Sequence, residues 1–314
     1  MSDLVIGIGA SHTTLMNTQW AKVDHLQRAH DYRDGLLQAR ELLKAARPDV
    51  AIVIGSNHFR GFWLDLMPAF TIGVGDVISS GEHGTPAGPL PTDPVFAHAL
   101  CQSLVEADVD MAFSDRLTVD HGISHAVQWV MGEEMALPIV PIVINCFAPP
   151  LPSLSRSVQV GRLIGDIVAR IGEDKRVAII ATGGLSHQLP FPDWRSPASD
   201  DDRFLAQSWK DGRNDWEQFE KRRRDIIVNA PPRTNPDFDK AFLARLEEGT
   251  LTSLATEIDQ DDLVAAAGNG GNEIRAWLMM AAAMNDLPGK TIAHADMPEW
   301  LTGMAVASIE PDPN

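Results

Sequence analysis

The sequence predicts an α/β fold in a single domain spanning residues 1–314: a mostly parallel central sheet flanked by helices, with a helical C-terminal portion. Two observations support this prediction: short apolar runs rich in β-branched residues, and helix-like stretches between them. The runs are bounded by Gly, Pro or Asn, and they are Leu4–Ile8, Val50–Ile54, Ile139–Asn145 and Val177–Ala181. Continuous apolar strands that alternate with helices are typical of a parallel sheet covered on both faces.

Helix-like stretches and one further strand complete the core of the predicted fold. Tyr32–Ala46 ends just before Pro48, and Val158–Ile171 has the same helical texture. Ala69–Gly73 is a candidate added strand.

The segment from about 191 to 239 differs from the rest of the chain. It contains the charged run Glu220–Asp225, and we interpret it as a solvated helical excursion. The basic residues Lys221 to Arg224 within it are assigned to a charged helix face rather than to an anion site. From Asp239 the pattern is helical again, and the glycine-rich turn Asn269–Asn272 marks the start of the last helix.

Composition restricts the possible partners and the compartment. The hydrophobic fraction of 44% and the charged fraction of 22% suit an ordinary globular protein with a sizeable core. The formal net charge of −17 argues against nucleic acid or an anionic membrane as partner, because both need a basic surface. It does not exclude a small anionic substrate. Two distant cysteines, Cys101 and Cys146, and the lack of a signal-peptide or membrane-span pattern favour a cytoplasmic protein.

Three histidines follow three of the predicted strands. His12 ends VIGIGASH, His58 ends AIVIGSNH, and His187 ends AIIATGGLSH. In an open α/β sheet, ligands bind in the crevice beyond the carboxyl ends of the strands, so these side chains are expected to converge there. Neutral imidazole is a common metal ligand, which makes a metal the natural reason for such convergence.

Glu273 is the candidate carboxylate ligand. It lies in the first turn of a helix, after a glycine-rich turn that allows close backbone approach. Two histidines and one carboxylate leave coordination positions open for substrate and O₂ on iron. The pattern alone favours an ordinary acid at a helix start over a metal ligand, and the same ligand set also suits a zinc hydrolase.

A second group of polar residues lies in Val119–His125. His121 and His125 are candidate acid–base groups, and Asp120 is placed to orient its neighbour. Asp120 and His125 are also candidate substrate-binding residues. The two glycines before His187 would let that histidine reach into a cleft.

In this order, the motifs resemble those of the class III extradiol dioxygenases of the protocatechuate 4,5-dioxygenase β-subunit type. Within that family, the single-chain 2,3-dihydroxyphenylpropionate 1,2-dioxygenases are most similar. The resemblance runs from residue 5 to about residue 303, and the matching motifs are Ser11-His12-Thr13, Ser56-Asn57-His58, Thr118–Gly122, Thr182–Gln188 and Asn272–Trp277.

The resemblance implies Fe(II) held by His12, His58 and Glu273. It also implies that His187 and His121 are the acid–base pair, with His187 deprotonating a hydroxyl or stabilising bound oxygen and His121 supplying a proton when the O–O bond breaks. The implied substrates are a catechol and O₂, the implied product is a ring-opened semialdehyde or keto-acid, and a homo-oligomer is expected by analogy.

Arg60 departs from the family pattern, two residues after His58. It is a candidate to pair a substrate carboxylate, or else it covers the sheet edge. The departure leaves the identity of the catechol open. The alternative function is a zinc-dependent or non-catalytic metal-binding relative of the same superfamily, and the presence of both His121 and His187 argues against a binding module.

Overall fold

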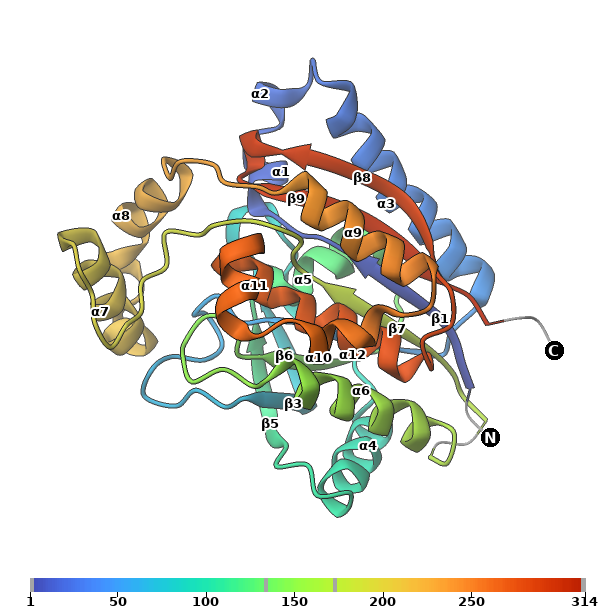
Figure 1. The fold of residues 1–314 in the computed structure, drawn as a ribbon. Helices are drawn as coiled ribbons and strands as arrows, with labels where there is room; N and C mark the ends of the chain where they lie inside the picture. The colour runs from blue at the N-terminus through green and yellow to red at the C-terminus, as the bar shows by residue number, and fades with distance from the viewer. Residues whose placement is uncertain (1–2, 133–134, 172–173, 312–314) are drawn as a thin grey trace.

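Four parallel strands form the centre of the sheet, and they are the four predicted apolar runs. They lie in the order β6-β2-β7-β1, and every neighbouring pair among them is parallel. The strands are β1 (Asp3–Ala10), β2 (Val50–Ser56), β6 (Ile139–Ile144) and β7 (Arg176–Thr182). This computed structural model describes residues 3–132, 135–171 and 174–311, and Figure 1 shows its fold.

Antiparallel strands extend the sheet on both sides, so the prediction of a mostly parallel sheet is wrong. The order is β4-β3-β6-β2-β7-β1-β9-β8, with β5 beside β3. Within the described residues, four pairings are antiparallel: β1 with β9, β3 with β4, β3 with β6, and β8 with β9. The added strands are β3 (Phe70–Ser80), β4 (Ala87–Leu90), β5 (Ala112–Val119), β8 (Lys290–Met297) and β9 (Thr302–Ile309). Only β3 was predicted, from the run Ala69–Gly73.

Helices cover both faces of the sheet, as its doubly buried strands require. On β2, Val50, Ile52 and Ile54 pack into one core and Ala51 and Val53 into the other. Helices α4 (Pro94–Glu106), α6 (Leu154–Val168) and α12 (Ile274–Ala283) contribute to the first core, and α3 (Gln27–Ala46) and α5 (His121–Ala126) to the second. The predicted helix Tyr32–Ala46 is confirmed within α3. The predicted helix Val158–Ile171 is confirmed as far as Val168, where α6 ends.

The charged excursion is helical, but it is not wholly solvated. It contains α7 (Asp200–Asp215) and α8 (Glu217–Val228), which lie to one side of the sheet (Figure 1). Trp209 of α7 is fully buried, stacked on Phe59 with ring centroids 4.2 Å apart. Arg223 of α8 is buried as well. The inner faces of both helices therefore belong to the core. The sequence did not indicate this, because the buried stripe on each helix is narrow and most residues of the helix are polar.

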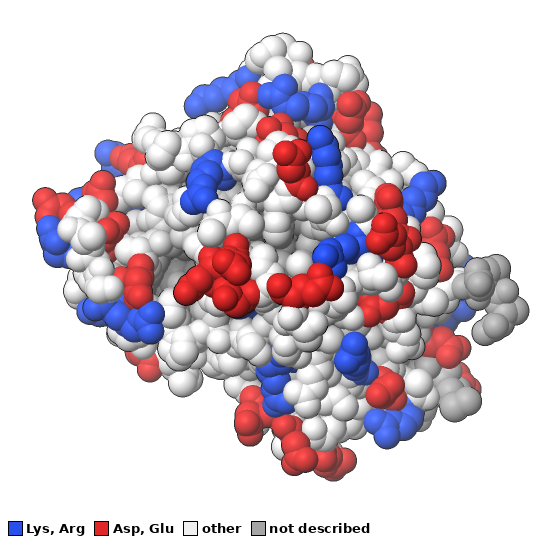
Figure 2. Space-filling view, in the orientation of Figure 1, with Lys and Arg blue, Asp and Glu red and all other residues white. Residues whose placement is uncertain are grey.

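The C-terminal part is helical only as far as α12. Helices α9 (Pro236–Glu247), α11 (Gln260–Ala267) and α12 confirm the predicted pattern, but the hairpin β8–β9 follows them. The remaining short helices are α1 (Thr14–Thr18), α2 (Trp20–Val23) and α10 (Leu254–Glu257). No helix in the described ranges is both long and apolar enough to cross a membrane. Figure 2 shows acidic and basic side chains interspersed on one face of this acidic protein.

Candidate active site

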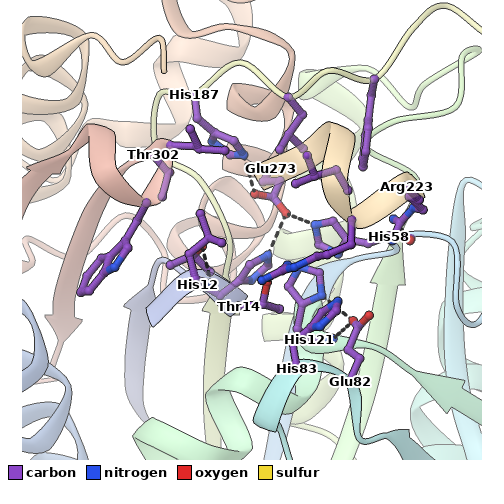
Figure 3. A pocket seen from close by; sticks show the side chains of 18 residues that line it. His12, Thr14, His58, Glu82, His83, His121, His187, Arg223, Glu273 and Thr302 are labelled. Atoms are coloured by element: carbon purple, nitrogen blue, oxygen red, sulfur yellow. Dashed lines mark hydrogen bonds and ion pairs between the residues drawn. The ribbon is translucent and has the colours of Figure 1, made fainter. Parts of the chain in front are cut away.

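Five predicted side chains line one cavity at the carboxyl ends of the parallel strands (Figure 3). His12 follows β1, His58 follows β2, and His187 follows β7. His121 is the first residue of α5, and Glu273 ends the 3₁₀ turn Asn269–Glu273 that leads into α12. The crevice beyond the strand ends thus brings together residues that are far apart in sequence, as predicted.

The carboxylate of Glu273 lies among three of these histidines. Its Oε1 is 3.1 Å from Nε2 of His12 and 3.4 Å from Nε2 of His58, and its Oε2 is 3.6 Å from Nε2 of His187. The hydroxyl of Ser56 donates to Oε1, and the backbone N–H of Gly184 donates to Oε2 at 2.8 Å. Burial alone would raise the pKa of Glu273, but its contacts with His12 and His58 hold it well below the usual range. The group is therefore an anion at neutral pH.

Two glycines allow the chain to pack this closely. Gly183 has φ +97°, and a Cβ there would lie 2.7 Å from Cδ of Glu273. A Cβ at Gly270 would lie 2.1 Å from the ring of His187. Both the glycine pair before His187 and the glycine-rich turn before Glu273 are therefore needed to bring these two side chains together.

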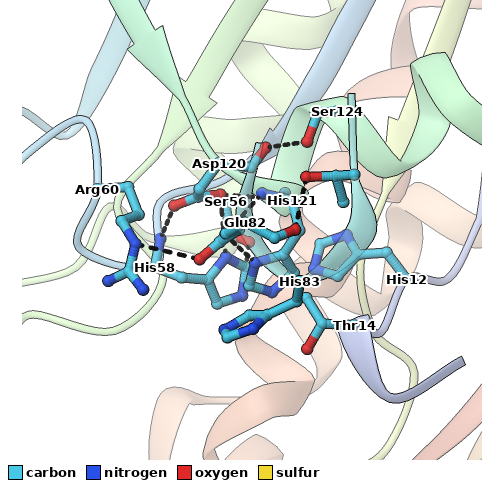
Figure 4. A network of polar contacts seen from close by, with 12 residues as sticks. His12, Thr14, Ser56, His58, Arg60, Glu82, His83, Asp120, His121 and Ser124 are labelled. Carbon is cyan, nitrogen blue, oxygen red and sulfur yellow. Dashed lines mark hydrogen bonds and ion pairs between the residues drawn. The ribbon is translucent and has the colours of Figure 1, made fainter. Parts of the chain in front are cut away.

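Asp120 fixes the orientation of His58. Its carboxylate accepts hydrogen bonds from the His58 backbone N–H and from Nδ1 of the ring, the latter at 3.2 Å (Figure 4). Because a carboxylate only accepts, Nδ1 carries the hydrogen and Nε2 faces the cavity. Burial acts to lower the pKa of His58, but the charges of Asp120 and Glu273 outweigh it and raise this pKa to about 9. The buried carboxylates of Asp120 and Glu273 thus favour a positive charge at the position of the His58 ring.

Glu82 fixes His121 in a similar way. Nδ1 of His121 donates to Oε1 of Glu82 at 2.5 Å, and the His121 backbone N–H donates to the same oxygen at 3.0 Å. Arg60 holds the other oxygen, with Nε 3.1 Å from Oε2. Burial, followed by the charge of His58, lowers the pKa of His121 to about 4. At neutral pH this imidazole is uncharged, and its Nε2 has a lone pair available as a base.

His187 is also a neutral imidazole with a fixed ring. Its Nδ1 lies 3.1 Å from the carbonyl oxygen of Leu185, which can only accept, so the hydrogen is on Nδ1. Burial lowers the pKa of His187 although Glu273 acts in the opposite direction. His121 and His187 therefore both line the cavity as imidazoles whose Nε2 is free to accept a proton.

The donor atoms around this cavity suit a divalent metal. Nδ1 of His12 is buried without a hydrogen bond, and Nε2 is not aligned to form one although it lies 3.1 Å from Oε1 of Glu273, which is costly unless a ligand satisfies these nitrogens. Donor atoms of His12, His58 and His121 lie within 4.8 Å of one another, and Glu273 adds a carboxylate beside two of them. Nitrogen and carboxylate donors of this kind suit iron or zinc.

Metal binding to the metal-free protein is expected to release a proton and to weaken in acid. A pKa of about 9 keeps His58 protonated at pH 7, and the ring must lose that proton to become a ligand. Apparent affinity should therefore fall about tenfold for each unit of pH below this value. Chelator competition at several pH values measures it. An affinity independent of pH would contradict the assignment of His58.

Asp120→Asn provides the variant for the same measurement. It removes the largest of the charges that raise the pKa of His58, so the pH slope should flatten. Loss of the ring's orientation should also lower affinity by about 10- to 100-fold. Asp93→Asn is the matched control, because Asp93 caps α4 as Asp120 caps α5 and does not line the cavity.

Like Asp120, the other candidate substrate-binding residue, Arg60 and His125 do not line the cavity. Arg60 pairs with Glu82 and with Glu220, Nη2 to Oε2 at 2.6 Å, and its guanidinium lies 3.6 Å from the Trp216 ring centroid. His125 is buried behind His12, with ring centroids 6.3 Å apart. Both residues therefore support the walls of the site.

The sequence interpretation missed several cavity residues. Glu82, His83, Arg223 and Arg224 all line the cavity, and the placement of Lys221 to Arg224 on a solvated face is wrong for the last two. The signal for Arg223 was present: it lies four residues before Ile227, which also lines the cavity, so both fall on one helix face. Glu82 lies two residues after the end of β3, at the start of the 3₁₀ turn Glu82–Gly84, but the predicted strand ended at Gly73, so the sequence did not place Glu82 at a strand end.

Known proteins are similar to this chain over nearly its full length. A family model described as "Catalytic LigB subunit of aromatic ring-opening dioxygenase" matches residues 7–305. A 2,3-dihydroxyphenylpropionate/2,3-dihydroxicinnamic acid 1,2-dioxygenase from Rhodococcus jostii (strain RHA1) is 31% identical over 313 residues, covering 95% of this chain and 96% of the relative. A relative of the same name from Burkholderia vietnamiensis (strain G4 / LMG 22486) is 34% identical over 297 residues, covering 90% and 88%.

A solved structure shares the fold. The crystal structure of an uncharacterized protein from Escherichia coli K12 matches with a TM-score of 0.52 at 14% identity, covering 97% of this chain and 99% of that one. At this identity the match bears on the fold alone. The family match and the two dioxygenase relatives show that the chain belongs to the LigB family of aromatic ring-opening dioxygenases, the class III extradiol enzymes that its motifs predicted.

Proposed function

We propose that the protein opens the ring of a substituted catechol by extradiol cleavage with O₂, using Fe(II) held by His12, His58 and Glu273. The observation that carries this proposal is the position of Glu273 Oε1, 3.1 Å and 3.4 Å from Nε2 of His12 and His58, in a cavity that also holds two neutral imidazoles. The names of the relatives support a catechol as substrate, because each names a 2,3-dihydroxylated aromatic acid.

The ligand set with Glu273 is preferred to one of three histidines. Nδ1 of His121 is held by Glu82, and the ring stacks on that of His58 with centroids 3.9 Å apart, which suits a group beside the metal. Two histidines and one carboxylate are the ligand set that leaves positions open for substrate and O₂ on non-haem Fe(II), and zinc accepts this set as well as three histidines. When bound, Fe(II) would hold the diol and O₂ in reacting geometry and supply the electron transfer between them.

His187 and His121 carry out the proton transfers in this proposal. Each is neutral with its lone pair on Nε2, so His187 accepts a proton from one ring hydroxyl and His121 accepts the other. Ring opening adds O₂ and no protons overall, so each imidazole must give back the proton that it accepted, and His187 returns its proton to the ring-opened product. His121 returns its proton to oxygen when the O–O bond breaks. Glu82 lowers the cost of the intervening charge on His121, because its carboxylate already accepts the hydrogen on Nδ1.

Apolar side chains complete the cavity and suit an aromatic ring. They also exclude water from the reacting groups, which strengthens the electrostatic interactions there. These residues are Leu15, Leu189, Phe191, Ile227, Trp300 and Leu301.

Metal replacement tests the proposal. Protein loaded anaerobically with Fe(II) should consume O₂ and give a yellow ring-opened product with a panel of catechols, whereas Zn(II)-loaded protein should not. Ring cleavage with zinc alone would indicate the zinc-dependent relative, and metal binding without any cleavage would indicate the non-catalytic one.

A further inference from the structure

Arg223 is a buried cation without an acidic partner. Its side chain lines the cavity and is 4% exposed. Nη2 donates to the backbone carbonyl of His58 at 2.8 Å, and Nε is buried without a hydrogen bond. No carboxylate of the described chain forms an ion pair with it. A buried charge in this state is costly, and a ligand anion would relieve the cost.

Arg224 adds a second guanidinium on the same side of the cavity. It is half-buried, and its Nη1 and Nη2 donate to the hydroxyls of Thr14 and Thr18 at 2.9 Å and 2.8 Å. These partners are neutral, and the described residues give Arg224 no ion pair either. Arg223, Arg224 and Ile227 thus form the face of α8 that lines the cavity.

Other arginines nearby are neutralised, which sets this pair apart. Arg60 pairs with Glu82 and Glu220, and Arg222, on the outer face of α8, pairs with Asp201 at 2.8 Å. The carboxylates around the cavity already have partners: Glu82 contacts His121, and Glu220 contacts His83 at 3.3 Å. Burial, followed by the charge of Arg60, lowers the pKa of Arg223 to about 9, so the group stays charged at neutral pH.

We propose that Arg223 and Arg224 bind a carboxylate on the ring substituent of the catechol, which makes α8 the element that selects an anionic substrate. This inference rests on the proposed ring cleavage. Figure 3 shows Arg223 beside His58, on the other side of Glu273 from His187. The diol would therefore lie beside His12, His58 and Glu273, where the metal would bind it. The ring substituent would extend towards α8. A guanidinium suits the task because it bonds a carboxylate through two parallel N–H groups.

The test compares carboxylates with matched amides in two assays. The first measures kcat/KM for catechols that carry either a carboxylate or a primary amide on the side chain. Arg223→Gln and Arg224→Gln should each lower kcat/KM for the carboxylate by about 10- to 100-fold and change that for the amide by less than about threefold. Arg222→Gln is the matched control, since it removes the same charge from the outer face of α8, and it should leave the preference unchanged.

The second assay does not depend on turnover. Calorimetric titration with 3-phenylpropionate and 3-phenylpropanamide measures binding by the metal-free protein. The parent should bind the carboxylate more tightly, and Arg224→Gln should abolish that preference. Because Arg224 is only half-buried, this variant keeps the test decisive if Arg223→Gln fails to fold.

The two assays separate failure of this inference from failure of the proposed function. A carboxylate preference in binding without any ring cleavage would support the arginine site and overturn the proposed chemistry. Equal losses on carboxylate and amide catechols would assign the arginines to the reacting ring or to the new carboxylate of the product, and would overturn the inference. A parent without any preference for the carboxylate would overturn it as well.

Discussion

Glu273→Ala is expected to release the metal and to reduce ring cleavage by more than about 10³-fold. The substitution removes the carboxylate that lies 3.1 Å and 3.4 Å from Nε2 of His12 and His58. Of the three proposed metal ligands, only the two imidazoles then remain. Metal content after dialysis, measured by mass spectrometry of the ion, and the rate of O₂ uptake report the two losses separately. Glu273→Gln should behave similarly, because an amide keeps the shape but not the charge.

Unfolding of the Glu273→Ala variant would also cause loss of metal and of ring cleavage. Glu273 also accepts hydrogen bonds from Ser56 and from the Gly184 backbone, so folding must be checked by circular dichroism. Glu257→Ala is the matched control, because its carboxylate lies outside the cavity and pairs with Arg245. Full metal content in a folded Glu273→Ala protein would show that the carboxylate is not a ligand and would favour the set of three histidines.

His187→Ala is expected to keep the metal and to lower kcat by about 10²- to 10⁴-fold, the usual worth of a positioned acid–base group. The ring lies 3.6 Å from Glu273 and makes its own hydrogen bond to Leu185, so its removal should leave His12, His58 and Glu273 in place. Stopped-flow turnover and metal content of the same preparation measure the two properties. His98→Ala, an exposed position on α4, provides the control.

Two outcomes would contradict this role of His187. Turnover at the parent rate would mean that no proton passes through His187, and loss of the metal would make it a ligand. His121→Ala gives the complementary comparison: it should also keep the metal, since Glu82 holds that ring through Nδ1.

Much of the site could be predicted because parallel strands present the residues that follow them at one edge. His12, His58 and His187 share that context, and the structure brings them together around Glu273. The partners of these residues could not be predicted in the same way. Glu82 is 39 residues from His121, and Arg223 is 165 residues from His58. Only the folded chain brings such pairs into contact.

The fold was predictable where fully buried strands are built from large β-branched residues, and less so where burial is partial or the buried residues are small. Strands β2, β6 and β7 are buried on both faces and therefore read as continuous apolar runs. Strand β5 alternates and lies at the edge, and β9 is built largely from small residues such as Gly303, Ala305 and Ala307. Small residues carry little strand preference, so β9 left no pattern that would distinguish it from a loop.

The central claim is that the protein inserts O₂ into an aromatic ring beside a vicinal diol. The most direct measurement is the mass of the product formed by Fe(II)-loaded protein from a catechol under isotopically labelled O₂. The account predicts one O₂ consumed per catechol, a yellow ring-opened product, and both labelled atoms within it. A product with one labelled atom, or hydrolysis without any O₂ uptake, would contradict it.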